Sequence, residues 1–347
     1  MRALEQPGHP TTVVTRRTAV TGLAAFAGLT ALGAGSRPAK AQATVLRLGH
    51  VLAPTHQFHT GMELAASKLL EATGGRVRLE VFPSSQLGTE RDMHVAIRTG
   101  AIDMLLGSPG GSSVHLPELA VLDAPYLFRD NVHWQSVVYG NFGREWEART
   151  LAASGVRIVG WFHRGTRHVV SRNRPYHTLA DMAGQKIRVA DLPPFPQVFA
   201  ALGAAPTPIA FAEMYGALQA GTVDGADAPL DTILSQKLFE VSRYTNLIAW
   251  SFAAPGTILM AEGSYQQLSP ADQEALRAAL VEGSQLITDA FTDGEAAVKA
   301  QLLAQGMELI TPTDPEAWAA AAAASIPDLA ATWGGDADLY HRIRNAG

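Results

Sequence analysis

Apolar residues recur along the chain at spacings typical of strands and helices, beginning at residue 44. Residues 44–51 alternate apolar and polar side chains as a half-buried strand does, and residues 77–82 repeat the pattern before Pro83. Between them, residues 59–73 carry apolar side chains at helical spacing and end at a Gly-Gly pair, which stops a helix. This strand–helix–strand order predicts a parallel α/β sheet.

The alternation continues to the C-terminus and predicts a chain of two α/β lobes. Further strands are predicted at residues 104–107, 156–163, 168–171, 186–189, 207–209, 223–226, 247–252, 256–261 and 307–310. Helices are predicted at residues 89–99, 131–153, 196–202, 213–220 and 231–238, followed by a long helix at 270–305 and a closing helix at 314–333, bent at Pro327. Ligands of open α/β sheets bind beyond the carboxyl ends of the strands, so two such lobes predict a hinged central cleft.

The first 43 residues do not fit this pattern and predict a secretory signal peptide. A polar start holds the pair Arg16 and Arg17, residues 19–35 are uncharged, and small-x-small cleavage sequences end at Ala41 and Ala43. The paired arginines and the Gly-rich core are typical of twin-arginine export. The alternative is an uncleaved anchor, although the run is short and Gly-rich for a membrane span.

Composition narrows the classes of protein that remain. The chain has 347 residues, no cysteine and a formal net charge of −5. The leader holds five basic residues and one acidic residue, so its removal leaves 22 basic and 31 acidic residues and a net charge of −9. The absence of cysteine excludes disulfides, thiolate metal sites and a cysteine nucleophile, and the acidic balance argues against general nucleic-acid binding.

Several short motifs, in order along the chain, resemble the solute-binding proteins of TRAP (tripartite ATP-independent periplasmic) transporters. The resemblance covers residues 44–340 and is carried by VFPSSQLG (81–88), TGAID (99–103), PYLF (125–128), LADMAG (179–184), KIRV (186–189), LGAAPTP (202–208) and FAEMYGALQAGTVDG (211–225). It implies a monomeric periplasmic binder of small organic acids that delivers its ligand to a membrane permease. No enzymatic activity and no cofactor are implied.

The resemblance also implies a type II-like periplasmic binding protein fold, with a central cleft and a long helix that spans both lobes. Lobe I is expected to comprise residues 44–165 plus about 252–290, and lobe II residues 166–251 plus about 291–347. An exported enzyme that acts on organic acids, or a ligand-sensing partner of a signalling receptor, are the alternatives. The sequence has no P-loop, no Gly-x-Ser-x-Gly and no His-Glu-x-x-His motif to favour an enzyme.

Arg188 matches the family arginine that holds the ligand carboxylate, and a guanidinium can pair with both carboxylate oxygens. Arg167 resembles a second family arginine near the ligand, with Arg164 as a competitor for that role. Phe211 matches an aromatic residue that packs on the ligand's carbon skeleton. Asp191 lies just after Arg188 and is expected either to meet a ligand hydroxyl or amine or to cap the following helix.

The sequence departs from the family pattern at the next strand end. Ala228 stands where an asparagine usually points into the site, Asp227 keeps the acidic position, and Trp250 replaces a residue that is commonly polar. Together with Phe211, these residues favour an apolar cleft wall and an acid with a hydrophobic or aromatic portion.

Lobe I is expected to contribute His50, at the end of the first strand, and Glu90, at the start of the second helix. Both positions lie near the ligand in the family. His56 and His59 lie nearby, but the spacing of these groups fits no metal-site template. Hydrogen bonding or solvation is the expected role of the histidines, and no metal is expected.

Overall fold

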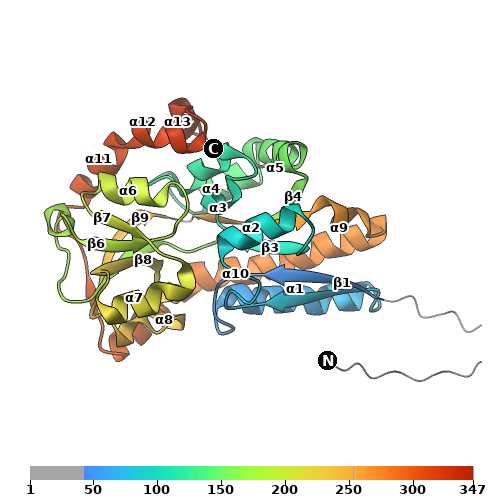
Figure 1. The fold of residues 1–347 in the computed structure, drawn as a ribbon, viewed down its shortest axis with the longest axis horizontal. Helices are drawn as coiled ribbons and strands as arrows, with labels where there is room; N and C mark the ends of the chain where they lie inside the picture. Colours follow the sequence, from blue (N-terminus) through green and yellow to red (C-terminus); the bar gives the residue numbers. More distant parts are fainter. Residues whose placement is uncertain (1–42, 253, 347) are drawn as a thin grey trace, which may run out of the picture. The chain divides into compact units, whose positions relative to one another are not determined.

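The computed structural model describes residues 43–252 and 254–346, which form two α/β lobes (Figure 1). Lobe I contains a five-stranded sheet in the order β2 (Val77–Phe82), β1 (Thr44–Gly49), β3 (Met104–Gly107), β10 (Pro255–Ala261) and β4 (Val156–His163). Lobe II contains a six-stranded sheet in the order β11 (Glu308–Ile310), β9 (Tyr244–Ser251), β5 (Arg167–Ser171), β8 (Gly225–Pro229), β6 (Lys186–Val189) and β7 (Ala205–Pro208). The predicted two-lobed α/β fold is confirmed. The predicted signal peptide, apart from its last residue, Ala43, lies outside the described residues.

Both sheets are mixed, which corrects the expectation of a parallel sheet. The β1–β2 pair is parallel, with Leu48 opposite Val81, but β10 is antiparallel to β3 and β4, and β5 is antiparallel to β8 and β9. The physical reason is the path of the chain between the lobes. Strands β5 and β10 are each entered directly from the other lobe, so they begin at the cleft, where β3, β4, β8 and β9 end.

The helices begin at capping signals in the sequence. In α2 (Glu90–Arg98), Thr89 accepts a hydrogen bond from the Asp92 backbone while the Asp92 side chain accepts one from the Thr89 backbone, which satisfies two free helix-end donors. The other helices before α10 in the two lobes are α1 (Gln57–Ala72), α3 (Pro109–Ser112), α4 (Asn131–Val138), α5 (Asn141–Ser154), α6 (Phe195–Ala201), α7 (Met214–Ala220), α8 (Leu230–Ser235) and α9 (Glu262–Gln266). The single helix expected over residues 131–153 is two helices, separated at Gly140.

Helix α10 (Pro270–Ala304) connects the two lobes (Figure 1). Ser269 caps it and Pro270 opens its first turn, as the sequence predicted. The helix packs on α1 and β4 in lobe I and on α8 and β11 in lobe II. Its expected apolar stripe is buried, comprising Leu276, Leu280, Ile287, Phe291 and Val298. The predicted long helix across both lobes is confirmed.

The C-terminal segment ties the lobes together from another side. It forms α11 (Pro315–Ala324), α12 (Ile326–Leu329) and α13 (Ala337–Arg344), of which α13 was not expected from the sequence. One apolar cluster runs from Trp161 of lobe I through Trp333 of this segment to Phe199 and Trp250 of lobe II. Within the described part of the chain, no helix is both long enough and apolar enough to cross a bilayer.

Candidate ligand-binding cleft

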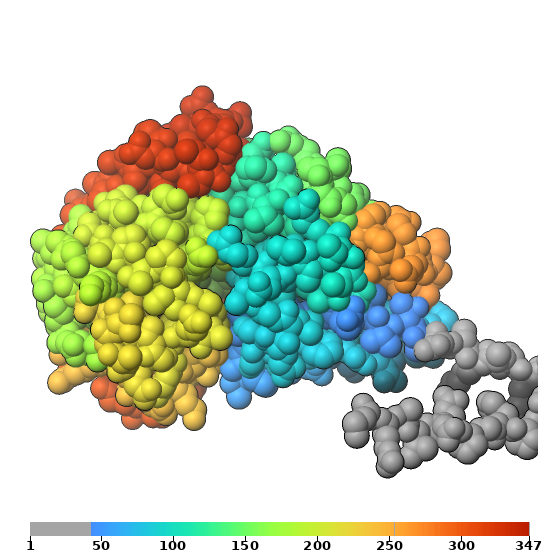
Figure 2. Space-filling view, in the orientation of Figure 1, coloured from blue at the N-terminus to red at the C-terminus, as the bar shows by residue number. Residues whose placement is uncertain are grey.

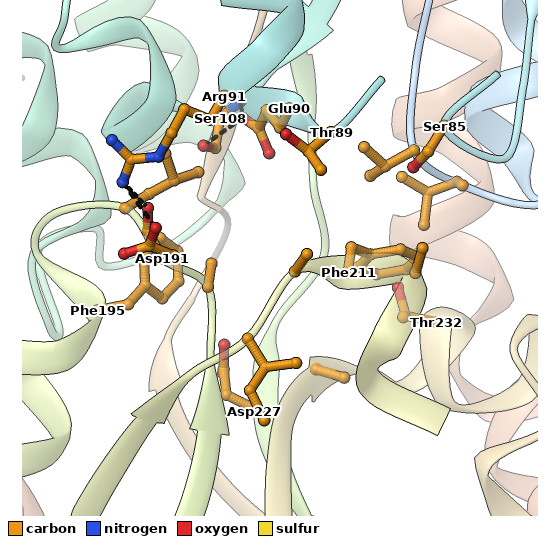
Figure 3. A pocket seen from close by; sticks show the side chains of 18 of the residues that line it. Ser85, Thr89, Glu90, Arg91, Ser108, Asp191, Phe195, Phe211, Asp227 and Thr232 are labelled. Atoms are coloured by element: carbon orange, nitrogen blue, oxygen red, sulfur yellow. Dashed lines mark hydrogen bonds and ion pairs between the residues drawn. The ribbon is translucent and has the colours of Figure 1, made fainter. Parts of the chain in front are cut away.

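A cavity of about 300 Å³ lies where the two lobes meet. In the space-filling view, the cyan surface of lobe I abuts the yellow and yellow-green surface of lobe II along this seam (Figure 2). The start of α2 and the end of β3 form one side of the cavity, and the ends of β6 and β8 with Phe211 form the other (Figure 3). The strand ends therefore place side chains from both lobes around one space, as the cleft prediction requires.

Arg188 projects from β6, where it is paired in register with Thr207 of β7 and Ala226 of β8. The residue is buried, and its Nε donates to the carbonyl oxygen of Ile209 at 3.0 Å. Among the described residues, no carboxylate lies within ion-pair distance of its guanidinium. Burial lowers the pKa of Arg188 to about 10, which leaves it a cation at neutral pH. Arg188 is therefore a buried cation at the cavity wall, and no carboxylate of the described residues lies within ion-pair distance of it.

Arg167, by contrast, is paired with a protein carboxylate through Nε and Nη2. Its Nε lies 3.1 Å from Oδ2 of Asp227 and 3.2 Å from Oδ1, and its Nη2 also bonds Oδ2. The Nε1 of Trp250 donates to the Oδ1 of Asp227 at 2.8 Å. All three residues are buried, and the Phe195 ring lies 5.0 Å from the Arg167 guanidinium carbon. This arrangement holds Arg167 at the cavity while neutralising its charge.

Arg164 also lines the cavity and has its own acidic partner. Its Nη1 lies 2.9 Å from Oδ1 of the buried Asp123, which also accepts the N–H of Gly110 at 2.8 Å. Burial raises the pKa of Asp123, and the charge of Arg164 and the Gly110 hydrogen bond oppose that shift. Arg164 and Arg167 thus both line this cavity, and each is paired with an aspartate.

Glu90 faces the cavity from the first turn of α2, on the side opposite Asp227 (Figure 3). Its Oε1 accepts hydrogen bonds from the backbone N–H and the hydroxyl of Ser108, both at 2.6 Å, and lies 3.7 Å from Nε2 of His94. Burial alone would raise the pKa of Glu90, but the nearby His94, the charge of Arg164 and the Ser108 hydrogen bond lower it to about 2. Glu90 is therefore a fixed negative charge.

Phe211 lines the cavity from the start of a short 3-10 helix (Phe211–Glu213). Its ring centre lies 5.9 Å from the guanidinium carbon of Arg188. Ala228 also lines the cavity, and the remaining apolar side chains on its wall include Val51, Leu52, Phe58, Leu106 and Ile209. Phe211 and Ala228 thus form part of a wall that is largely apolar away from the charged groups.

Asp191 lines the cavity mouth and joins the two lobes. The Nη2 of Arg91, on α2, lies 2.9 Å from Oδ2 of Asp191 and also bonds its carbonyl oxygen. Both side chains are more than half exposed. The expectation that Asp191 caps the next helix is wrong, because Pro194 is the N-cap residue of α6. Two residues separate Asp191 from that position, so its side chain is not at the helix end.

The residues that line the cavity do not include Trp250 and His50, and direct contact of either with a ligand stays a prediction. Trp250 is fully buried behind Asp227, so it acts on the cavity through that carboxylate. His50 is buried at the end of β1, where its Nε2 lies 3.3 Å from Nδ1 of His59 and its Nδ1 accepts from the backbone of Leu52. Burial, and secondarily the charge of His59, lowers the pKa of His50 to about 3. Among the described residues, no group of three His, Cys, Asp or Glu side chains is placed to hold a metal ion.

Sequence reasoning did not assign roles to Arg91, Asp123, Phe195 and Ser108. Ser108 lies in the Gly-rich segment 107–112, which indicated a loop beside the cleft but gave no sign of a hydrogen bond to Glu90. Asp123 and Arg91 are ordinary charged residues in sequence, and their partners lie 41 and 100 positions away along the chain. Only the tertiary fold brings each pair together.

Two lobes with a charged cavity between them define the architecture of a solute-binding protein. The family model DctP, bacterial extracellular solute-binding protein, family 7, matches residues 48–332, and the chain belongs to this family. A solute-binding protein of Roseobacter denitrificans is 32% identical over 311 residues, which cover 88% of this chain and 92% of that protein. The 2,3-diketo-L-gulonate-binding periplasmic protein of Escherichia coli is 29% identical over 304 residues, covering 88% and 91%.

Solved structures show the same fold. A TRAP periplasmic solute-binding protein from a Polaromonas species, bound to D-erythronate, has a TM-score of 0.82 and 29% identity and covers 87% of this chain and 99% of its own. Another, from Roseobacter denitrificans with bound L-galactonate, has a TM-score of 0.81 and 29% identity and covers 87% and 98%. One relative is longer: this chain spans 57% of an uncharacterised Sinorhizobium fredii protein, at 35% identity over 313 residues.

Proposed function

We propose that this protein captures a small organic acid in the cleft and delivers it to a TRAP membrane permease. The observation that carries the proposal is Arg188, a buried guanidinium at the cavity with no carboxylate partner among the described residues. A buried charge without a counter-ion is costly, and a ligand carboxylate supplies that counter-ion through two hydrogen bonds. The relatives that bind D-erythronate and L-galactonate support this class of ligand.

Capture and closure follow from where the charges lie. The acid enters between open lobes, pairs with Arg188 and draws lobe I onto lobe II, after which the Arg91–Asp191 pair spans the mouth of the cleft. Exclusion of water strengthens the buried ion pair, so the ligand favours the closed form, and the permease reads that form. The hinge comprises the crossings at residues 163–167 and 250–255 together with α10.

The remaining parts of the proposal concern the setting of the protein. Relatives are named periplasmic proteins, and this chain reaches the periplasm by twin-arginine export with cleavage near Ala41 or Ala43. The protein acts as a monomer that binds its acid without converting it, and it uses no cofactor and binds no nucleic acid. The boundaries between its lobes lie near residues 165, 252 and 290. Recovery of the added acid unchanged by NMR supports a binder, whereas a new product supports an exported enzyme.

The test of the proposal is the substitution Arg188→Ala, assayed by isothermal titration calorimetry with D-erythronate and L-galactonate. Affinity should fall more than about tenfold, because losing a charge-assisted pair costs roughly 1.5–3 kcal/mol. Arg188→Lys keeps the charge but loses the planar fork, and should give an intermediate affinity. Arg243→Ala is the control, since Arg243 is an exposed arginine of lobe II that pairs with Glu308. Unchanged affinity in Arg188→Ala contradicts the role of Arg188.

A further inference from the structure

Most charged side chains on the described cavity wall pair with an oppositely charged residue, but Arg188, Glu90 and the exposed Glu213 have no aspartate, glutamate, arginine or lysine within ion-pair distance. Arg164 is paired with Asp123 and Arg167 with Asp227, and the exposed Arg91 is paired with Asp191 at the mouth. Among the described residues that line the cavity, only Arg188 remains as a cation without a carboxylate partner. A ligand with one carboxylate can pair with this arginine. A second carboxylate on the ligand would have no other arginine without a partner on the described cavity wall.

Glu90 stays negative while it faces the same space, with Nε2 of His94 3.7 Å from its Oε1 (Figure 3). Its hydrogen-bond donors, the backbone and hydroxyl of Ser108, both reach Oε1, and among the described residues no group donates to Oε2. The side chain is 20% exposed and lines the cavity, so a ligand there can reach this carboxylate. A carboxylate oxygen accepts hydrogen bonds and cannot donate them, so it favours a ligand hydroxyl or amine and repels another carboxylate.

We propose that Glu90 selects ligands by charge: the cleft binds monocarboxylates that present a hydroxyl group to Glu90, and it rejects dicarboxylates. The inference rests on the proposed function, because it assumes that Arg188 holds the ligand carboxylate. The cavity is at the small end of ligand pockets, so the far end of a ligand held by Arg188 lies within a few ångströms of the other walls. Two like charges in such a poorly screened space repel strongly.

Matched pairs of acids test the selection directly. D-Erythronate and meso-tartrate, and likewise L-galactonate and galactarate, differ only in a terminal CH₂OH group that becomes a carboxylate. Calorimetry at pH 7.5 should show that the wild-type protein binds the monoacid of a pair at least tenfold more tightly than the diacid. Equal affinities within the pair overturn the inference.

The substitution Glu90→Gln removes the charge and keeps an oxygen that can accept the Ser108 hydrogen bonds. It should reduce the preference for the monoacid at least tenfold, through weaker monoacid binding and stronger diacid binding. Glu90→Asp keeps the charge and should keep the preference. Glu147→Gln is the matched control, because Glu147 accepts from Trp161 Nε1 at 2.9 Å outside the cavity. An unchanged preference in a folded Glu90→Gln protein overturns the inference.

The two proposals fail in different ways. If no acid of either pair binds, or if Arg188→Ala leaves binding unchanged, the proposed function fails and the charge selection fails with it. If both acids of a pair bind through Arg188 with equal affinity, the proposed function stands and the role of Glu90 alone is overturned.

Discussion

At the scale of single residues, Asp227 holds two side chains of lobe II. It accepts hydrogen bonds from both the Arg167 guanidinium and the Trp250 indole, while Arg188 nearby has no carboxylate of its own among the described residues. An arginine paired with a carboxylate and an arginine without one therefore lie at the same cavity. Trp250 contributes by holding Asp227 in place and has no contact with the cavity.

Trp250→Phe tests this role of the indole. The change removes the Nε1 hydrogen bond to Asp227 together with part of the buried ring. We expect the free energy of unfolding to fall by about 1–3 kcal/mol more than in Trp134→Phe, since a hydrogen bond to a charged group is worth about that much. Trp134 is also fully buried, but its Nε1 has no hydrogen-bond partner among the described residues. Equal losses in urea denaturation of the two variants contradict the role.

At the scale of secondary-structure elements, two glycines set how closely helices α1 and α10 pack against each other. A Cβ on Gly61 would lie 2.7 Å from the carbonyl oxygen of Gly283, and a Cβ on Gly283 would lie 2.4 Å from the carbonyl oxygen of Gly61. The two backbones therefore touch, and no side chain larger than hydrogen fits between them. This contact fixes α10 to lobe I, so that the rest of the helix carries that position into lobe II.

Gly283→Ala should force the two helices apart. We expect the free energy of unfolding to fall by about 1–3 kcal/mol, as in other overpacked cores. Gly294→Ala in the same helix is the matched control, because nothing lies within 4 Å of its Cβ position. That control should raise stability by roughly 0.5–1 kcal/mol through helix propensity. Thermal and chemical denaturation compare the variants, and a stabilised Gly283→Ala protein contradicts the predicted contact.

At the scale of the whole molecule, the two lobes are in contact beside the cavity. Arg91 of lobe I bonds Asp191 of lobe II, and a Cβ on Gly110 of lobe I would lie 2.0 Å from the carbonyl oxygen of Pro193. Both contacts are made by the loop that follows β6, the strand that carries Arg188. Lobe closure and Arg188, the arginine proposed to bind the ligand, are therefore linked through the seven residues from Arg188 to Pro194.

Gly110→Ala should hold the lobes apart without unfolding either of them. The added methyl group meets the Pro193 backbone, which cannot move aside as a flexible side chain can. We expect affinity for D-erythronate or L-galactonate to fall at least tenfold, because the ligand then binds an incompletely closed cleft. Gly216→Ala, with nothing within 4 Å of its Cβ position, is the control. Calorimetry and small-angle scattering measure affinity and closure, and unchanged closure in Gly110→Ala contradicts the prediction.

Much of the fold and part of the cleft could be predicted from local sequence. The bounds of β2, β3, β4 and β6 agree with prediction, and Ser269 with Pro270 marks the start of α10, because strand alternation and helix caps are local signals. Of the predicted cleft residues, Arg188, Arg167, Phe211, Asp227, Asp191 and Glu90 line the cavity. Their roles toward a ligand stay predictions until the variants above are measured.

The sequence alone determined the residue types at the cleft and the elements that carry them. The tertiary structure alone decided which charges cancel, since Arg167 and Asp227 lie 60 residues apart and Arg164 and Asp123 lie 41 apart. It also decided that Trp250 and His50 lie behind the wall and that β5 and β10 run antiparallel to their neighbours. The physical reason is that hydrogen bonds, ion pairs and strand direction depend on three-dimensional distance, whereas caps and hydrophobic periodicity depend on residues a few positions apart.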